Sequence, residues 1–467
     1  MAAVGTVVSV PSVFAGKAPL RLGVLSDIHV SVPDCVAHDA HARTCLENLA
    51  PFERALRQFR ARGVDAVVIA GDLTEFGLVP ELKAVADIWY RVFPDDCGAD
   101  GAKVEKLFIL GNHDAIAWRW VSTYTGEEWE GEKRRQKWND SIARDPAAAW
   151  RTCFGEDYAP IQLKTVRGIR FVLAHWLSLP ENERNWRGGA DVPGLAAFFD
   201  AHRAELSDGR PFFYVQHAHP QGTCLPFATG DHGPATKVLA SFPNAIALSG
   251  HAHQPLTDER NVWQGAFTSI GTGTLESAGG RDYRENGAPY ARGVSKLAPM
   301  PCFETRDCKH GAYLVLSDGR LTVERLDFVW GHRLGPDWTL SLPADGTVRY
   351  GADATAFPVP QFAADARGAV RGTDDRLVVT FPAANAAGRV YDYEVRAILL
   401  ADDYERSVSS KRILAPDYHL PPEKANRGGE AWFAKAELPS NGRLRFDIVP
   451  VNCFGRSGRV LSVSTCY

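Results

Sequence analysis

The stretch Leu110-Gly111-Asn112-His113-Asp114 comes directly after an apolar run, Val104 to Leu110, that is typical of a buried strand. Gly111 lets the backbone turn sharply, so that an amide, an imidazole and a carboxylate stand in a row at the carboxyl end of this strand. Polar groups beside a core cost free energy unless something binds them. The stretch therefore predicts a binding site at the end of a strand.

Four further stretches repeat this design of a strand followed by a polar cluster. They are Leu22–Leu25 followed by Ser26-Asp27-Ile28-His29, Ala66–Ala70 followed by Gly71-Asp72, Phe212–Gln216 followed by His217-Ala218-His219, and Ala245–Leu248 followed by Ser249-Gly250-His251-Ala252-His253. Helices predicted at 51–62 and 80–91 separate the first three strands, which indicates a mostly parallel sheet covered on both sides. Ligands of such sheets bind beyond the carboxyl ends of the strands, where all five clusters lie.

The side chains of these clusters are typical metal ligands. Seven of them offer an oxygen or an imidazole nitrogen: Asp27, His29, Asp72, Asn112, His217, His251 and His253. A mixed nitrogen and oxygen set without thiolate favours Mn, Fe, Zn, Ni or Co over copper(I) or structural zinc. Seven ligands exceed the needs of one ion, so the set predicts two divalent or trivalent transition-metal ions, ~3.5–4 Å apart.

The five motifs match, in order, those of the calcineurin-like metallophosphoesterase superfamily, over about residues 20–330. The resemblance implies an α/β fold, a four-layer α/β/β/α sandwich. It also implies a dinuclear metal-dependent phosphoesterase that hydrolyses phosphate mono- or diesters by in-line attack of a metal-bound hydroxide. Its substrate would be a small-molecule phosphate ester, with a nucleotide and a phospholipid head group both left open.

The resemblance also implies a role for each side chain. One ion would be held by Asp27, His29, Asp72 and His253. The second would be held by Asp72, Asn112, His217 and His251. The catalytic pair would be His113, near the leaving-group oxygen, and Asp114, which would orient the His113 ring. Glu75 stands where purple acid phosphatases of this superfamily have a tyrosine ligand, so no tyrosinate–iron centre is expected.

Three further residues are candidate substrate contacts. The fourth cluster contains both His217 and His219; His217 is nearer the strand and is favoured as the ligand, which leaves His219 to support a ligand or touch the substrate. His175 ends another strand and is either a substrate contact or a structural histidine. Arg187, like Arg281, either clamps a phosphate or is a solvated surface residue.

A chain of 467 residues predicts more than one domain. We expect an N-terminal tail at 1–19, a phosphoesterase domain at 20–340, and a small all-β sandwich at 345–467 whose end resembles a fibronectin type III domain. A tryptophan-rich insertion is predicted at about 115–165, where the tryptophans either pack the insertion or stack on the substrate. Strands at 265–275 and 311–329 predict an antiparallel second sheet, and 276–309 predicts a long surface loop.

The overall composition excludes some classes of protein. The net charge of −4 does not indicate the excess of basic residues that is typical of nucleic-acid-binding proteins. No apolar run is long enough to cross a bilayer. The apolar segment Ala2–Ala15 resembles the remnant of a signal peptide, so export to the periplasm or the outside is expected, with the cytoplasm as the alternative. Cysteine pairs 35/45, 302/308 and 453/466 are spaced as disulfides, or the cysteines are ordinary buried thiols. The oligomeric state does not follow from the sequence.

A function of a different class is also compatible with the sequence. The protein would then be a catalytically silent surface binding protein, with the phosphoesterase fold as a scaffold and the β-sandwich docking a glycan or a protein. Because every cluster keeps its ligand residues, the enzyme is the favoured hypothesis.

Overall fold

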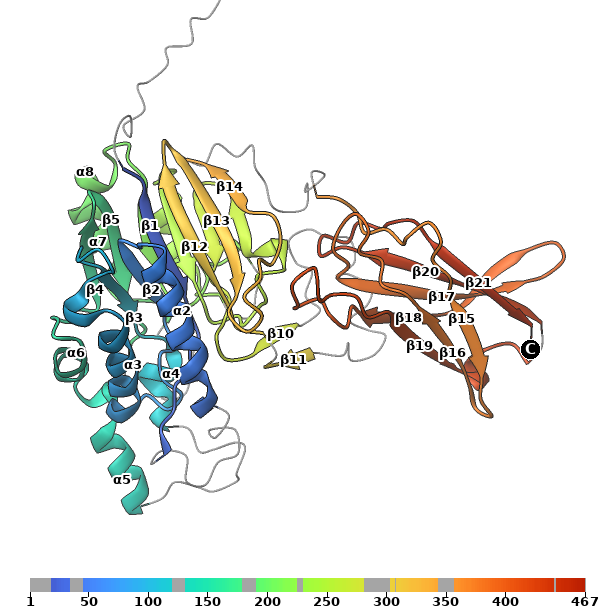
Figure 1. Ribbon diagram of the computed structural model, residues 1–467, viewed down its shortest axis with the longest axis horizontal. Coiled ribbons are helices and arrows are strands. Elements are labelled where there is room, and N and C mark those ends of the chain that lie inside the picture. The colour runs from blue at the N-terminus through green and yellow to red at the C-terminus, as the bar shows by residue number, and fades with distance from the viewer. Residues whose placement is uncertain are drawn as a thin grey trace, which may run out of the picture.

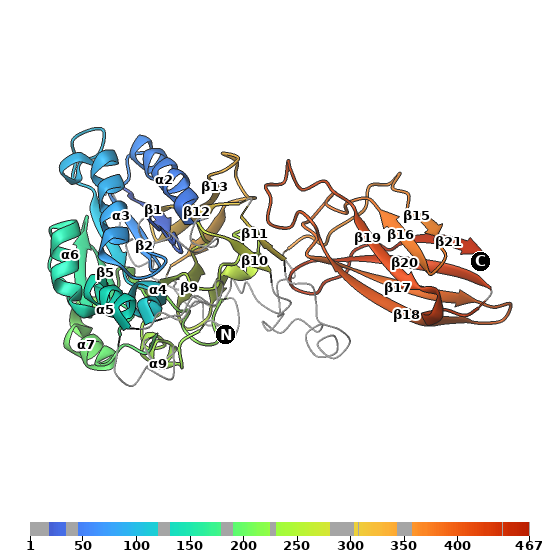
Figure 2. The same cartoon turned by 90° about the horizontal axis from the view of Figure 1, so that it is seen from below.

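Two lobes lie side by side in the computed structural model, an α/β domain and a β-sandwich domain (Figures 1 and 2). The structure describes residues 18–33, 45–119, 131–178, 190–224, 230–280, 303–306, 308–342, 357–440 and 442–466. The N-terminal segment, Arg187 and Arg281 lie outside these ranges, so export and the phosphate clamp stay predictions. Among the described residues, no helix is both long enough and apolar enough to span a membrane.

The first sheet of the α/β domain contains six strands in the order β14-β13-β12-β1-β2-β3. Their bounds are β1 (Leu20–Leu25), β2 (Ala66–Ala70), β3 (Glu105–Ile109), β12 (His310–Ser317), β13 (Arg320–Asp327) and β14 (Trp338–Ser341). The strands β1, β2 and β3 pair in parallel, as their helical connections predicted. The remaining pairs are antiparallel.

The second sheet also contains six strands, in the order β4-β5-β6-β7-β9-β8. Their bounds are β4 (Ile161–Val166), β5 (Ile169–Ala174), β6 (Phe212–Val215), β7 (Ala245–Ser249), β8 (Val262–Gln264) and β9 (Thr268–Gly271). The predicted antiparallel second sheet is therefore wrong. The hairpin β12–β13 joins β1 in the first sheet, whereas β9 pairs in parallel with β7, because the choice of partner strand depends on distant residues that periodicity does not reveal.

Helices cover the outer face of each sheet. The α-helices that the structure describes in this domain are α2 (Leu49–Ala61), α3 (Val79–Val92), α4 (Asn112–Ile116), α5 (Gly131–Asp140), α6 (Pro146–Phe154), α7 (Leu195–Ala201), α8 (Arg203–Leu206) and α9 (Pro234–Leu239), of which α4 lies at the strand ends and α5 is largely solvent-exposed. One apolar core joins α2, α3 and α6 to the first sheet, a second fills the space between the sheets, and a third joins α7 and α9 to the second sheet. The predicted four-layer α/β/β/α sandwich is confirmed.

The predicted insertion at about 115–165 contains α5, α6 and the edge strand β4. The Trp150 ring is buried against Phe154 and belongs to the core under the first sheet. The Trp118 and Trp138 rings contact each other at a centroid distance of 4.6 Å, and Trp138 is 39% exposed. Trp150 therefore packs this region onto the sheet, as large aromatic side chains usually do.

The β-sandwich domain consists of two antiparallel sheets, ordered β15-β16-β19 and β18-β17-β20-β21. Their bounds are β15 (Ala369–Gly372), β16 (Arg376–Phe381), β17 (Asp392–Leu400), β18 (Glu405–Leu414), β19 (Gly429–Ala434), β20 (Arg443–Val451) and β21 (Leu461–Cys466). A core with Tyr393, Phe433 and Phe446 lies between them. The sandwich is as predicted, and β15 and β21 are additional strands. In the α/β domain, a short ladder of β10 (Ala278–Gly280) and β11 (Phe303–Thr305) lies within the predicted loop 276–309.

Two of the three predicted disulfides are wrong. Cys45 carries a free thiol. The register of β20 and β21 places Cys466 beside Arg443, whereas Cys453 follows the other end of β20, about 30 Å away at ~3.3 Å per residue. A disulfide needs Cα atoms within about 7 Å of each other. Cys302 lies outside the described residues, so its pair with Cys308 stays a prediction.

Candidate metal centre

The strands β1, β2 and β3 of the first sheet and β6 and β7 of the second end at the same edge of the sandwich. The loops that follow them bring all seven predicted ligand side chains together. Five of the seven are buried, and the two from the last cluster, His251 and His253, are partly exposed. Residues separated by more than two hundred positions therefore meet at one site.

Four side chains form a first group of potential ligands. The group consists of Asp27, His29, Asp72 and His253. The His253 Nε2 lies 3.2 Å from Asp27 Oδ1 and 3.2 Å from His29 Nε2. The His29 Nε2 lies 3.5 Å from Asp72 Oδ2. These atoms converge on one point, as the ligands of one ion would.

A second group shares Asp72 with the first. It consists of Asp72, His217 and His251, with Asn112 beside them. The His217 Nε2 lies 3.0 Å from Asp72 Oδ2 and 3.1 Å from Asn112 Oδ1. Because Asp72 belongs to both groups, its carboxylate is the natural bridge between two ions.

Three imidazoles are held so that the same nitrogen points into the site. The Nδ1 atoms of His29, His217 and His253 donate to Glu75 Oε2 at 2.8 Å, to Ala70 O at 2.7 Å and to Ser277 O at 2.9 Å, respectively. A neutral ring that donates through Nδ1 carries its lone pair on Nε2. Partners of this kind fix the tautomer that a metal needs.

This tautomer brings lone pairs together. His29 Nε2 faces His253 Nε2, and His217 Nε2 faces the amide oxygen of Asn112, so acceptors oppose acceptors at 3.1–3.2 Å. Such contacts are unfavourable unless a proton or a cation lies between the atoms. The donor set of imidazole, carboxylate and amide oxygen, without thiol, suits two transition-metal ions. The site residues therefore fit the group that the sequence predicts, although they do not identify the metal.

The backbone of the site is strained. Nine non-glycine residues among those described have a positive φ, and five of them are potential ligands. They are Asp27, His29, Asp72, His251 and His253, with φ between 50° and 68°. This conformation costs free energy for an L residue, and it persists where the surrounding structure enforces it, commonly at functional sites.

Two motif glycines make room for this arrangement. A Cβ at Gly111 would overlap with the backbone nitrogen and carboxylate of Asp72, and a Cβ at Gly250 would overlap with Ser26 and come within 2.6 Å of Asp27 Oδ2. Glycine is therefore needed at both positions because another loop that carries a ligand packs directly against the backbone there, leaving no room for a side chain.

In the metal-free protein, protons on the imidazoles balance the two carboxylates. Burial alone would lower the pKa of His29, but the hydrogen bond with Glu75 and the charge of Asp72 raise it to about 10. Burial likewise opposes protonation of His217, whose pKa the charge and hydrogen bond of Asp72 raise to about 9. A metal ion binds only the deprotonated nitrogen, so metal binding has to displace these protons.

We expect Mn²⁺ binding at pH 7.5 to release about one to two protons per chain, because both histidines start protonated. Isothermal titration calorimetry in buffers of different ionisation enthalpy measures this number. Glu75→Gln should release fewer protons, since it removes a charge that raises the pKa of His29. Equal binding enthalpies in all buffers would contradict the expectation.

The same shifts predict how the stability of the metal-free protein depends on pH. The pKa of His29 is higher in the folded protein than its unfolded value of 6.5, so protonation of His29 stabilises the folded state. This contribution to the free energy of unfolding is complete below pH 6.5 and is lost as the pH rises to about 10. The thermal midpoint of the metal-free protein should therefore fall between pH 7 and 9.5. The Mn²⁺-loaded protein should show a smaller fall, since the ions replace the protons.

The partners of His113 correct one prediction. Its Nδ1 donates to the backbone oxygen of Glu75 at 2.8 Å, and the Glu75 carboxylate lies 3.6 Å away. Asp114 instead accepts from Thr74, Leu73 and Gly111 and ties the first turn of α4 to the β2 loop. The prediction that Asp114 orients the His113 ring is therefore wrong, because its carboxylate is occupied by backbone amides and a hydroxyl.

Glu75 is a residue whose role the sequence did not reveal. Its carboxylate holds His29 and its carbonyl oxygen holds His113, whose rings contact each other at a centroid distance of 4.3 Å. His29, Glu75 and His113 also form a third group of potential ligand atoms. We interpret Glu75 as a residue that positions the His29 ring rather than as a metal ligand. It accepts a hydrogen bond from Nδ1 of His29, while Nε2 of His29 faces the first ligand group.

His175 is a structural histidine. It is fully buried, its Nδ1 accepts from Leu110 N at 3.0 Å, and burial lowers its pKa to about 3. The ring packs against Trp150 and Tyr158. A neutral ring inside the core cannot touch a substrate, so the prediction of a substrate contact is wrong.

His219 is also buried, with Nδ1 3.3 Å from Cys224 Sγ, and burial lowers its pKa to about 4. His217, not His219, lies among the potential ligands. The sequence did not single out Trp176, whose ring centroid lies 5.9 Å from that of His217 and 5.4 Å from that of His251. The position of Trp176 just after strand β5, at the same edge as the ligand clusters, is the sequence feature that could have identified it. Trp176 forms an apolar wall beside the second ligand group.

The sequence profile described as calcineurin-like phosphoesterase matches residues 20–255, which is just over half of the chain. The chain belongs to this family. The match begins at β1 and ends just after His253, so it spans all five clusters of the calcineurin-like phosphoesterase. A comparison with curated proteins finds no match.

Several solved structures resemble this calcineurin-like phosphoesterase. A purple acid phosphatase from yellow lupin (Lupinus luteus) seeds is 14% identical, with a TM-score of 0.40, over 70% of this chain and 54% of the lupin chain. A dimetal phosphatase from Danio rerio is 14% identical, with a TM-score of 0.33, over 69% of this chain and 99% of its own. The chain thus spans about half of the lupin enzyme.

Proposed function

We propose that the chain is a dinuclear metal-dependent phosphoric ester hydrolase that acts on small phosphate mono- or diesters. The observation that carries this proposal is the pair of ligand groups that share Asp72. Hydrogen bonds from Nδ1 to a carboxylate or to a backbone oxygen hold three of their imidazoles with Nε2 directed into the site. When bound, the two ions supply Lewis-acid chemistry: they lower the pKa of a water molecule and neutralise the phosphate oxygens.

Each side chain has a distinct role in the proposed site. Asp27, His29 and His253 would hold one ion, and Asn112, His217 and His251 the other, with Asp72 between them. The carboxylate of Asp27 also accepts from the backbone nitrogen of His251 at 3.1 Å, which ties the last ligand loop to the first. A phosphate ester would bind at the rim of the site, where His113 and His253 are partly exposed.

His113 would donate a proton to the leaving-group oxygen. Its side chain is 19% exposed, and its Nδ1 is fixed by the Glu75 carbonyl oxygen. Burial and the neighbouring charge of His29 lower the pKa of His113 below its usual value of 6.5. The protonated form is therefore a strong acid that is populated mainly at acid pH.

Replacing His113 by alanine should slow alkyl phosphate esters by about 10²-fold and p-nitrophenyl esters by less than about tenfold, because a good leaving group needs little protonation. The difference should grow as the pH falls toward 6, following the lowered pKa. Steady-state kinetics with both ester types measures it. Equal losses for both types would contradict the role of His113 as an acid.

The proposed function is tested directly with Mn²⁺-loaded protein. We expect about two ions per chain and hydrolysis of bis(p-nitrophenyl) phosphate or p-nitrophenyl phosphate. Two bound ions without hydrolysis of either ester would contradict the proposal, and absence of bound metal would favour the silent binding protein. A panel of nucleotides and glycerophosphodiesters then identifies the substrate class.

A further inference from the structure

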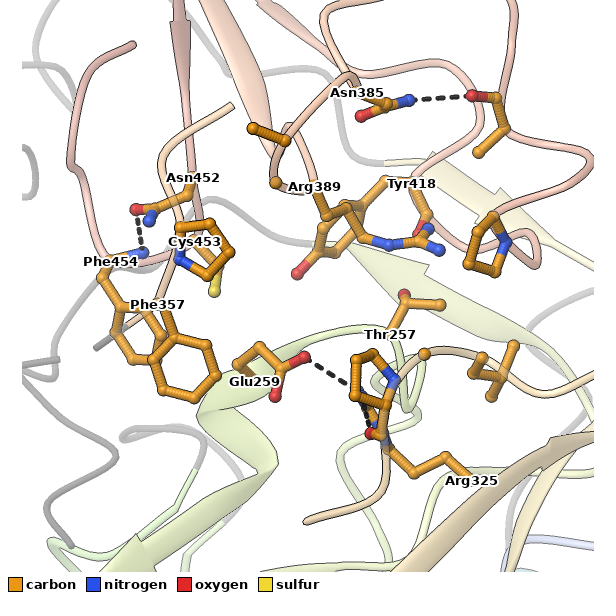
Figure 3. Close-up of a pocket in the computed structure, with 18 of the residues that line it drawn as sticks. Thr257, Glu259, Arg325, Phe357, Asn385, Arg389, Tyr418, Asn452, Cys453 and Phe454 are labelled. Carbon is orange, nitrogen blue, oxygen red and sulfur yellow. Dashed lines mark hydrogen bonds and ion pairs between the residues drawn. The ribbon is translucent and has the colours of Figure 1, made fainter. Parts of the chain in front are cut away.

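A cavity of about 430 Å³ lies between the two domains and shares no residue with the metal centre (Figure 3). The α/β domain contributes Thr257, Glu259 and Arg325, and the β-sandwich domain contributes Arg389 and Asn452. The volume falls within the range of small-molecule sites, which often form where two domains meet. We therefore considered which ligand its lining would accept.

Arg389 supplies a cation without a counter-ion. Its Nη1 donates to the backbone oxygens of Tyr418 at 2.7 Å and Leu420 at 2.8 Å. Among the residues that the structure describes, no carboxylate lies within ion-pair distance of Arg389, and no hydrogen bond occupies its Nε or Nη2. Burial lowers its pKa to about 10, so it stays charged at neutral pH. The Nε–Nη2 edge of a guanidinium matches a carboxylate with two parallel hydrogen bonds.

Buried polar atoms on both sides of the cavity also lack a partner within the described chain. They are Asn452 Nδ2, Thr257 Oγ1 and Arg325 Nε, in residues that are 4%, 1% and 1% exposed. The amide of Asn452 is oriented by its oxygen, which accepts from Phe454 N and Arg456 N at 3.0 Å each. Two of the three atoms can only donate, so the cavity favours a ligand rich in acceptors.

An aromatic wall completes the cavity. The Phe357 and Phe454 rings contact each other at a centroid distance of 5.1 Å, and both line it (Figure 3). On the opposite domain, Trp338 lies beneath the Arg325 guanidinium at 4.4 Å. Such rings bind flat apolar groups by stacking and by contact with ring edges.

We propose that this interdomain cavity binds a small aromatic carboxylate. The carboxylate accepts from the Nε–Nη2 edge of Arg389 and from Asn452 Nδ2, while the ring lies against Phe357 and Phe454. This proposal is independent of the proposed hydrolase function, because it concerns a different site and is tested by binding.

Binding is measured by calorimetry on the full chain loaded with Mn²⁺, with benzoate, nicotinate and indole-3-acetate as probes. Benzamide, nicotinamide and indole-3-acetamide are the matched neutral probes, and acetate lacks the ring. We expect at least one acid to bind with a Kd below about 1 mM and its amide to bind at least about tenfold more weakly. The proposal would be overturned if the acids bind no better than their amides, or if no acid binds with a Kd below about 1 mM.

The variant Asn452→Asp locates the site. It keeps the acceptor for Phe454 N and Arg456 N but replaces the unpartnered amide nitrogen with a carboxylate oxygen. We expect binding to weaken at least about tenfold, with hydrolysis per folded chain unchanged. Asn139→Asp, on the exposed face of α5, makes the same charge change and should leave binding intact. Binding that survives Asn452→Asp would overturn the proposal.

Acids could also bind the metal ions themselves. The Asp72→Asn variant separates the two sites, because it lies at the metal centre and not in the cavity. Binding that persists in Asp72→Asn and is lost in Asn452→Asp supports the cavity. The opposite pattern overturns it.

Discussion

Asp72→Asn is expected to reduce phosphoesterase activity by roughly 10³-fold or more, the size of effect seen when a charge that organises a transition state is removed. Asp72 is 1% exposed and belongs to both ligand groups. Its Oδ1 accepts from His113 N at 2.8 Å, and its Oδ2 faces the Nε2 atoms of His29 and His217. An amide keeps the shape but loses the charge that two cations would share, so bound metal should fall below two ions per chain.

A matched control distinguishes this effect from a loss of stability. Asp327 is also 1% exposed, and it accepts from two backbone amides and faces His310, outside both ligand groups. Asp327→Asn should lower the thermal midpoint while the metal content and the activity per folded chain stay unchanged. Full activity and two bound ions in Asp72→Asn would show that the ligand assignment is wrong.

Gly71→Ala is expected to produce the second largest loss of function. Gly71 has φ +91°, and a Cβ there would lie 2.7 Å from His217 Cγ and closer still to its Nδ1. The ring would have to move and would lose its hydrogen bond with Ala70 O. Loss of such a supporting bond costs about 10–100-fold in metal affinity, and activity at limiting Mn²⁺ should fall in proportion.

Gly63→Ala is the matched control at the other end of β2. Gly63 has φ +66°, and no atom lies within 4 Å of the position that a Cβ would take, so the substitution carries the backbone cost of about 1–2 kcal/mol without a clash. Both variants should therefore be less stable, but only Gly71→Ala should bind metal more weakly. Equal metal affinity in the two variants would contradict the proposed contact with His217.

The sequence predicted the parts of this fold that neighbouring residues decide. Apolar runs such as Ala66–Ala70 and the amphipathic pattern of α2 depend on local periodicity, and both lie where they were expected. The motif glycines mark turns at strand ends, so the seven potential ligands were identifiable before their geometry was known. The sequence could not show that β12 and β13 would join the first sheet, because a strand edge pairs with whichever distant edge the whole fold presents.

The tertiary structure alone decided the surroundings of the site. A backbone oxygen such as Ala70 O or Ser277 O, which fixes a ligand ring, carries no sequence signal. Asp114 and His175 are polar residues at strand ends, like the ligands, and only their burial and hydrogen bonds identify them as structural. The cavity beside Arg389 likewise exists only where two domains meet. Ligand types and strand ends are local properties of the chain, whereas hydrogen-bond partners, burial and cavities arise from contacts between residues far apart in sequence.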